Sequence, residues 1–422
     1  MFSNTHIHRA FLPAPALAAI VLLGLAAGCT QQPPPSKPAA FWPPYPDEPR
    51  IQYLRSIEKS GDIQPPKTSL EDLVLGKEPE TVMMVKLPYG VKMWHGRIYV
   101  CDISNSAVEI FDIQKKQTFI LGKGDSDHMM RPSDIAIAPD GTKYVADNGR
   151  EQILVYGPDD RFTNVLAHKD VKPVAVAVYQ DELFVCDQRG QRVVVLDRST
   201  GNLLRTIGAP GMKRGQFVSP IGITVDGQGS VYVMDVIKCQ LQKFDRAGKL
   251  LLAFGERGDN VGAMARPKQI AVDKDGFIYV VDAAFQNVQV FNQDGRLLTF
   301  FGSPGDHLGA MDLPAGISVC DTDIELFKDW VHPAFEPERL ILVTNQYGPS
   351  KVAVYALGHL KAGKTVADIS NTQGLVPSGL AKGNESKFAG IPTTMPSAGP
   401  MSGARPAVPV FGPALPQPAA AK

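Results

Sequence analysis

Residues 267–302 read PKQIAVDKDGFIYVVDAAFQNVQVFNQDGRLLTFFG, and this stretch decides the fold. It begins with a proline followed three residues later by an isoleucine, and three further apolar runs come after it. The runs are rich in β-branched and aromatic residues, and Asp-Gly dipeptides separate them. Such runs predict β-strands, and Asp-Gly between two of them predicts a hairpin. The stretch is therefore predicted to form four short antiparallel strands.

The same pattern occurs six times, at intervals of roughly 45 residues. The copies begin at Pro88, Pro132, Pro173, Pro220, Pro267 and Pro314. Four strands in a repeat of this length are typical of a propeller blade, whereas helical repeats would need a 3.6-residue period that these segments lack. The chain is predicted to be all-β, with a six-bladed β-propeller over residues 50–358.

The sixth copy lacks a fourth strand, and an unpaired strand-like segment stands before the first copy. This segment, residues 50–57, alternates apolar and polar side chains as an edge strand does. Pairing it with the last copy would close the ring and remove an exposed sheet edge. We therefore expect the N-terminal strand to complete blade six, with a short connecting helix at residues 69–76.

The N-terminus resembles a lipoprotein signal peptide. Basic residues precede a short apolar run that ends in Ala-Ala-Gly before Cys29, and the run is too short to span a bilayer. Residues 1–28 are expected to be removed and Cys29 to carry the lipid, the alternative being an ordinary secretory peptide. In the lipoprotein families that this segment resembles, Thr30 after the cysteine favours the outer membrane, facing the periplasm or the exterior.

Composition separates the flanking segments from the repeats. Residues 29–49 are rich in proline and predict an extended tether, and residues 359–422 are rich in Pro, Ala, Gly and Ser and predict disorder. Lys plus Arg and Asp plus Glu both number 43, so no net charge attracts the chain to nucleic acid. The remaining cysteines are Cys101, Cys186, Cys239 and Cys320. None has metal-site or haem spacing, and the same strand position of Cys101 and Cys186 in different repeats predicts separate buried thiols.

The repeat can now be compared with a known family. Its sequence Pro-x-x-Ile, Tyr-Val-x-Asp and Val-x-Val-Phe resembles the NHL repeat over residues 85–357. The segment from Trp42 to Leu54 resembles the start of bacterial envelope NHL lipoproteins. The resemblance implies a monomeric propeller in the cell envelope, within a multi-protein or electron-transfer assembly. Fold by itself does not assign a function.

A row of acidic and amide side chains follows the second strand of each copy, on the face where the prolines lie. Two interpretations are open: each side chain accepts backbone N–H groups in the adjoining turn, or the row forms a ring that binds a cation or substrate. The row consists of Asp102, Asp147, Asp187, Asp235, Asp282 and Asn345, the candidate ligand face.

Three histidines fall in loops between copies, on the same face. His128, His168 and His307 would support a metal site if they converged on zinc, as histidines do in the channel of a related propeller, the amidating lyase. Their surroundings differ, which favours solvated loop histidines. No cofactor is predicted, and zinc or calcium is kept as an alternative.

Blade six contains an insertion at residues 321–338, on the opposite face. It carries Phe327, Trp330 and Phe335, which are candidates for contact with a partner. The alternative is that these aromatic rings only roof the channel.

The first functional hypothesis is a cell-envelope lipoprotein whose propeller binds a protein partner or a small ligand. The second is a metal-dependent lyase or hydrolase that uses the three loop histidines. A third, RNA binding of the NHL type, conflicts with neutral charge and export. Phosphate-loop, nucleophile-elbow and His-Glu-x-x-His motifs are absent from the sequence.

Overall fold

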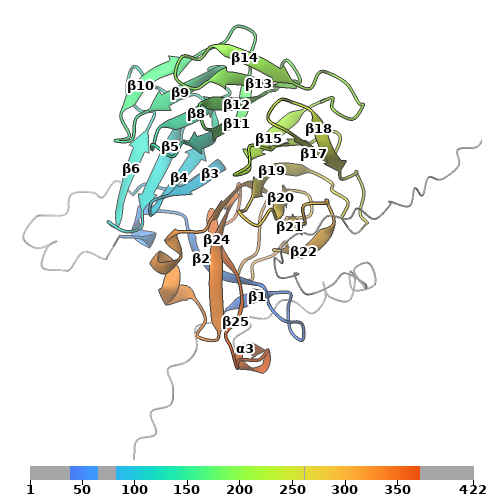
Figure 1. The fold of residues 1–422 in the computed structure, drawn as a ribbon. Helices are drawn as coiled ribbons and strands as arrows, with labels where there is room; N and C mark the ends of the chain where they lie inside the picture. Colours follow the sequence, from blue (N-terminus) through green and yellow to red (C-terminus); the bar gives the residue numbers. More distant parts are fainter. Residues whose placement is uncertain (1–38, 65–81, 261, 371–422) are drawn as a thin grey trace, which may run out of the picture. The chain divides into compact units, whose positions relative to one another are not determined.

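The computed structural model has six antiparallel sheets arranged around a common axis (Figure 1). It describes residues 39–64, 82–260 and 262–370. The expected six-bladed β-propeller is confirmed. The expected signal segment, Cys29, the helix at 69–76 and most of the C-terminal tail lie outside the described residues.

Five blades consist of four strands each, which follow one another outward from the axis in chain order. Blade one contains β3 (Pro88–Trp94), β4 (Arg97–Asp102), β5 (Ala107–Asp112) and β6 (Gln117–Leu121). Blade two contains β7 (Pro132–Ile137), β8 (Lys143–Asp147), β9 (Gln152–Tyr156) and β10 (Phe162–Leu166), and blade three contains β11 (Pro173–Tyr179), β12 (Glu182–Asp187), β13 (Arg192–Asp197) and β14 (Leu203–Ile207). Blade four contains β15 (Pro220–Val225), β16 (Val231–Asp235), β17 (Gln240–Phe244) and β18 (Leu250–Phe254), and blade five contains β19 (Pro267–Val272), β20 (Ile278–Asp282), β21 (Asn287–Phe291) and β22 (Leu297–Phe301).

Blade six has five strands, because the N-terminal part of the chain joins it. Its order is β1 (Ala40–Trp42), β2 (Ile51–Ile57), β25 (Val352–Leu360), β24 (Phe335–Asn345) and β23 (Pro314–Cys320). Strand β2 pairs with β25 from Ile51 opposite Leu357 to Ile57 opposite Val352. The expected closure of the ring by the N-terminal strand is therefore confirmed.

The sheet reaches further at both ends of the domain than the sequence predicted. Residues 40–42, expected in the tether, form β1, since Trp42 packs against Phe301 and Tyr355 rather than standing in solvent. Strand β25 continues to Leu360, and α3 (Ala367–Ser370) follows, with Ile369 buried in the core. Proline and small residues dominate the composition of these segments, so the few apolar residues that pack into the core were not recognised from the sequence.

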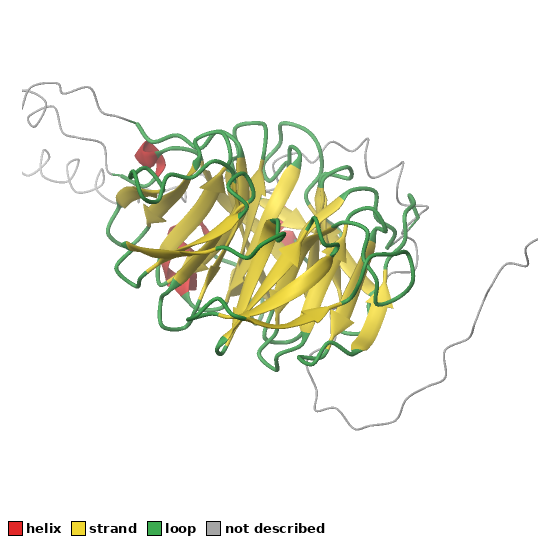
Figure 2. Ribbon diagram, turned by 90° about the horizontal axis from the view of Figure 1, so that it is seen from above, coloured by secondary structure: helices red, strands yellow, loops and turns green. Residues whose placement is uncertain are grey.

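The strands run between two faces that carry the connecting loops (Figure 2). We call the face where each innermost strand begins with its proline the proline face. The other, where β-turns join the first strand to the second and the third to the fourth, is the hairpin face. On the proline face each proline lies opposite the Asp or Asn that ends the second strand, as Pro267 lies opposite Asp282, and the register shifts just after it. Proline lacks an N–H, so a sheet edge next to a bulge is a position that tolerates it.

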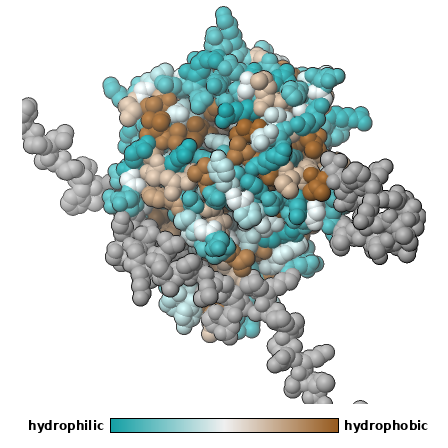
Figure 3. Space-filling view, turned by 180° about the vertical axis from the view of Figure 1, so that it is seen from behind, coloured by the Kyte–Doolittle hydropathy of each residue, from teal (hydrophilic) through white to brown (hydrophobic). Residues whose placement is uncertain are grey.

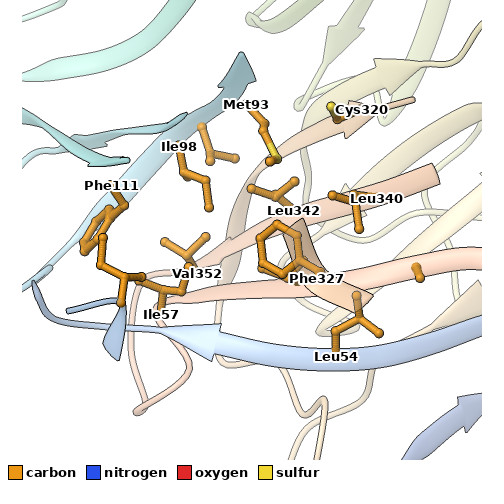
Figure 4. Packing of buried hydrophobic residues seen from close by; sticks show 14 of the residues in the cluster. Leu54, Ile57, Met93, Ile98, Phe111, Cys320, Phe327, Leu340, Leu342 and Val352 are labelled. Carbon is orange, nitrogen blue, oxygen red and sulfur yellow. The ribbon is translucent and has the colours of Figure 1, made fainter. Parts of the chain in front are cut away.

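The core lies at the junctions between blades. Six clusters of buried apolar side chains occur, one for each pair of neighbouring blades. At the junction of blades six and one, Phe327 points into a cluster with Leu54, Leu342 and Val352 (Figure 4). The four cysteines of the described residues are unpaired and buried, which agrees with the expectation of thiols. Among the described residues, no helix is long and apolar enough to cross a membrane.

Candidate functional site

The loop arrangement that the proline face repeats from blade to blade depends on the row of acidic side chains. Asp147 is fully buried, and its two carboxylate oxygens accept the backbone N–H groups of Met130 at 2.7 Å, Arg131 at 2.8 Å, Gly149 at 3.0 Å and Arg150 at 3.1 Å. One carboxylate thus joins the loop before the innermost strand to the turn after the second strand. The same arrangement recurs at Asp102, Asp187, Asp235 and Asp282.

These contacts favour the first interpretation of the row, in which each side chain binds backbone N–H groups of the adjoining loops. The five Asp side chains have no exposed surface, and their oxygens accept backbone N–H groups, except that Oδ2 of Asp187 accepts Nε of Arg192 at 3.2 Å. Asn345 of blade six differs: it accepts the N–H of Asp312 at 3.2 Å and donates to the carbonyl of Ser350 at 2.7 Å. The row therefore holds loops in place instead of offering open ligands to a cation.

The acidic row also holds basic residues that lie on the solvent side of it. Asp147, Asp187 and Asp282 accept the backbone N–H of Arg131, Lys172 and Arg266, the residues just before the prolines of their blades. The side chains of Arg131 and Arg266 are exposed, and no hydrogen bond or ion pair within the described residues holds either guanidinium. Because these residues precede innermost strands, they stand around the mouth of the central channel.

Lys268 lies just inside that mouth. It is only 5% exposed, its Nζ donates to Oε1 of Gln346 at 2.8 Å, and Nζ lies 5.5 Å from the centre of the Tyr89 ring. Burial, and then the nearby charge of Arg266, lower the pKa of Lys268 to about 8. Burial and the Asp134 carboxylate raise the pKa of Tyr89, and the charges of Arg266 and Arg131 act against that rise.

Two polar side chains close the channel beneath the mouth. Asp134 and Gln269 are 3% and 4% exposed, and Oδ2 of Asp134 accepts the N–H of Val176 at 3.0 Å. Asp134 Oδ1 and Gln269 Nε2 have no exposed surface, and the Gln269 side chain lies near enough to Asp134 to favour its carboxylate form. Burial raises the pKa of Asp134, opposed chiefly by the charge of Lys92. The mouth is therefore a cup with a closed polar floor.

The hairpin side of the channel is different in character. A cavity of about 190 Å³ there is lined mostly by first-strand residues such as Ile137, Val176, Val178 and Val225, with Lys92 among them. Most of its side chains are aliphatic, but the surface that they leave open is more polar than apolar, and Lys92 is the one titratable residue among them. The channel thus has a cationic mouth on one face and a hollow of mixed polarity on the other.

The three loop histidines do not come together. His128 is exposed, His168 contacts its own loop at the carbonyl of Lys169, and His307 is held by Ser303 at 2.8 Å. In the described part of the chain, no group of three or more His, Cys, Asp or Glu side chains could hold a metal ion. The described geometry therefore gives no support to a histidine metal site.

The insertion of blade six is packed rather than displayed, which corrects the expectation that its aromatic rings are exposed. Phe327 is 1% exposed and Phe335 is fully buried, because both belong to the cluster between blades six and one. Trp330, in the helical segment η2 (Asp323–Trp330), is half-buried under the guanidinium of Arg55 at 4.5 Å. The rings neither form an open patch nor roof the channel, and a partner contact here stays a prediction.

Exposed apolar side chains occur instead on the proline face. Met130, Met212, Ile237 and Tyr347 lie in its loops and are 57%, 69%, 51% and 57% exposed. The view from behind in Figure 3 shows apolar residues gathered in separate patches among hydrophilic ones. The cations and exposed apolar loops of this face were not predicted from the sequence, where the acidic row and the histidines stood out. The basic residue that precedes the proline in several repeats could have indicated the cations.

Comparison with known proteins gives a fold and no family. No protein-family model matches the chain, and no curated protein matches its sequence. Among solved structures, a protein of unknown function from Bacteroides thetaiotaomicron is 14% identical, with a TM-score of 0.51 over 73% of this chain and 75% of that one.

Two enzymes are also similar in structure. A streptogramin B lyase is 13% identical, with a TM-score of 0.46 over 65% of this chain and 94% of that one. A gluconolactonase from Xanthomonas campestris is 14% identical, with a TM-score of 0.47 over 76% of this chain and 98% of that one. Structural similarity at this level does not assign a function to the chain.

Proposed function

We propose that this protein is a lipid-anchored cell-envelope protein of the NHL-repeat type, whose propeller is a rigid scaffold that binds a partner or ligand on its proline face. The observation that carries the proposal is that, on this face, the acidic side chains are buried in structural contacts and basic side chains are exposed. The buried Asp row holds loops in place, whereas the exposed guanidinium groups of Arg131 and Arg266 have no hydrogen-bond or ion-pair partner among the described residues. The side chain of Met130 in the same loops is also exposed.

Binding is favoured over catalysis by the same geometry. A catalytic site needs a nucleophile or a general acid and base within reach of each other. At the mouth, within the described residues, the groups that meet are cations, a tyrosine and an amide, with a carboxyl closed off below them. Such a set recognises a charge and positions it.

The proposed anchor suits a binding scaffold. Ten residues lie between Cys29 and Ala40, the first residue of β1. Fully extended, the stretch from Cys29 to Ala40 reaches roughly 40 Å. A lipid on Cys29 would therefore keep β1 within that distance of the membrane.

The anchor is tested by Cys29→Ser in the full chain. We expect wild-type protein to incorporate labelled palmitate and to float with membranes, and the variant to appear in the soluble envelope fraction with an unchanged melting temperature. A wild-type chain without label, or a variant that still floats with membranes, would contradict the anchor.

The scaffold is tested by affinity capture from detergent-solubilised envelope. Wild-type protein is compared with Arg131→Gln combined with Arg266→Gln, and with Arg161→Gln as a matched control on the hairpin face, where Arg161 is 87% exposed. We expect the same partner with wild type and with the control, and its loss with the double variant. Capture that is equal in all three would show that the proline face does not bind.

A further inference from the structure

The cations at the channel mouth have a specific chemical preference. We propose that Arg131, Arg266 and Lys268 form a binding site for an oxyanion, the carboxylate or phosphate group at the end of a ligand. This inference rests on the proposed function, since it names the ligand chemistry of the same face. It is carried by the position of the cations, the lack of a side-chain partner for Arg131 and Arg266 among the described residues, and the closed floor beneath them.

Arg131 and Arg266 precede the innermost strands β7 and β19 of blades two and five, which lie across the axis from each other in a six-bladed ring. Lys268 is the second residue of β19 and leans toward blade six, where Gln346 accepts its hydrogen bond at 2.8 Å. The backbones of Arg131 and Arg266 thus lie on opposite sides of one opening on the proline face.

The positions are also fixed before any ligand arrives. Asp147 holds the N–H of Arg131 at 2.8 Å, and Asp282 holds that of Arg266 at 3.1 Å. A site whose backbone is already ordered loses less entropy on binding. Only the long side chains remain to be ordered, and an anion between them would do so.

The lack of partners distinguishes these arginines from most others in the ring. On the hairpin face Arg97, Arg198 and Arg246 each form an ion pair with an acidic residue of a neighbouring blade, at 2.6 to 2.8 Å. No acidic side chain in the described residues pairs with Arg131 or Arg266. Guanidinium groups bind carboxylate and phosphate through two parallel hydrogen bonds, so an oxyanion is the complement that the fold omits.

The floor limits how deep a ligand enters. Asp134 Oδ1 and Gln269 Nε2 have no exposed surface, so a ligand stops at the level of Lys268 and Tyr89. A negative ligand group gains nothing from approaching the Asp134 carboxyl more closely. The cup therefore suits a terminal oxyanion on a molecule whose remainder stays outside, against the apolar loops of the proline face.

The test is calorimetric titration of the purified full-length lipoprotein in non-ionic detergent, at constant ionic strength. The probes are inorganic phosphate and succinate. We expect one of them or both to bind at one site per chain, and at least tenfold weaker binding in Arg131→Gln and in Arg266→Gln. Arg161→Gln should bind within twofold of wild type. Phosphate alone would assign a phosphate ligand, and succinate alone a carboxylate.

Absence of binding by both probes at millimolar concentration would overturn the inference, as would equal weakening in Arg161→Gln. Circular dichroism melts of each variant separate lost binding from lost folding. If both probes fail while capture of a partner still depends on Arg131 and Arg266, the oxyanion site is wrong and the scaffold remains. If binding is found but no partner is captured, the anion site stands by itself.

Discussion

The two faces of the propeller use charge in opposite ways. On the hairpin face, ion pairs cross the junctions between blades: Arg97 with Asp160 at 2.6 Å, Arg198 with Asp140 at 2.8 Å, Arg246 with Glu182 at 2.8 Å, and Arg339 with Asp273. On the proline face, buried carboxylates bind chiefly backbone N–H groups, and one ion pair joins Arg189 to Glu151 of the neighbouring blade at 2.6 Å. Arg131 and Arg266 at the channel mouth have no ion-pair partner among the described residues.

The difference separates charges that build the ring from charges that remain for a ligand. A charge buried in a junction destabilises the fold unless a partner lies beside it, so every junction charge on the hairpin face that loses its partner should cost stability. An exposed cation at the mouth already has water around it, and its removal should change binding and leave the fold intact.

The largest effect is expected at Arg339. Its side chain is 2% exposed and contacts the fully buried Asp273 of blade five, which also accepts the Tyr279 hydroxyl at 2.8 Å. Arg339→Met would leave a buried carboxylate without its cation, at a cost of about 3–5 kcal/mol in the free energy of unfolding. Denaturant melts should show this loss with unchanged phosphate or succinate binding.

A second substitution sharpens the test at this junction. Combining Arg339→Met with Asp273→Asn removes the stranded charge and should recover part of the stability. Arg161→Gln, which breaks an exposed pair with Asp159, should cost less than about 1 kcal/mol. A single Arg339→Met variant as stable as wild type would show that the junction charges are not structural.

The next largest effect is expected at Asp147 on the proline face. Asp147→Asn places an amide NH2 where backbone N–H groups point, and hydrogen bonds to a charged group contribute about 1.5–3 kcal/mol. Blade six tolerates Asn345 because the carbonyl of Ser350 lies there to accept its amide. We expect a loss of about 2 kcal/mol in unfolding free energy and weaker anion binding, since the loop that carries Arg131 is loosened.

The control for Asp147 is Asp181→Asn, an exposed residue on the hairpin face whose carboxylate forms no hydrogen bond in the described structure. It should change neither stability nor binding. If Asp147→Asn weakened binding without any loss of stability, Asp147 would act on the ligand itself and the structural interpretation of the row would be wrong.

The contrast also explains what could be predicted from the sequence. Proline spacing and period-two alternation report backbone geometry, so the six blades and the closure by residues 50–57 followed from them. Charge partners depend on which loops meet in space. Asp147 and Arg131 lie 16 residues apart, and Arg339 and Asp273 lie 66 apart, so no local pattern says which of them is paired. Phe327 was misplaced for the same reason: its cluster partners, such as Leu54, are distant in the chain.

A pH effect is expected at Glu109, which is 1% exposed at the proline end of β5. Its Oε1 accepts Asn105 Nδ2 at 2.6 Å, Oε2 has no partner, and burial with the Asp102 charge raises its pKa from 4.5 to about 8. Between these values the unfolded chain loses the proton while the folded chain keeps it, so stability falls as pH rises from 4.5 to 8. Glu109→Gln should remove this fall. Its stability relative to wild type should therefore be greater at pH 8 than at pH 5, by about 3 kcal/mol in the free energy of unfolding.

The measurement is the difference in unfolding free energy between Glu109→Gln and wild type at pH 5 and at pH 8. The exposed Glu256→Gln, in a loop of the same face, is the matched control and should show no change with pH. A difference for Glu109→Gln that is the same at both pH values would mean that the carboxyl is ionised in the fold, and that a cation compensates it.

The smallest effect concerns binding alone and involves Lys268. Its pKa of about 8 means that the ammonium at the mouth is charged at pH 7 and largely neutral at pH 9, whereas the arginines stay charged. Succinate keeps its charge over this range, so its affinity for wild type should fall several-fold, up to about tenfold, as pH rises from 7 to 9. Lys268→Met should bind more weakly at pH 7 and lose the pH dependence, and the exposed Lys249→Met should behave as wild type.

A fall in affinity that persists in Lys268→Met would place the titrating group elsewhere, and the mouth would then be a site of arginines without the lysine. A wild-type affinity that does not change with pH would remove Lys268 from the site. Arg131 and Arg266 would still be tested by their own substitutions, because the three cations lie at different positions and have different contacts.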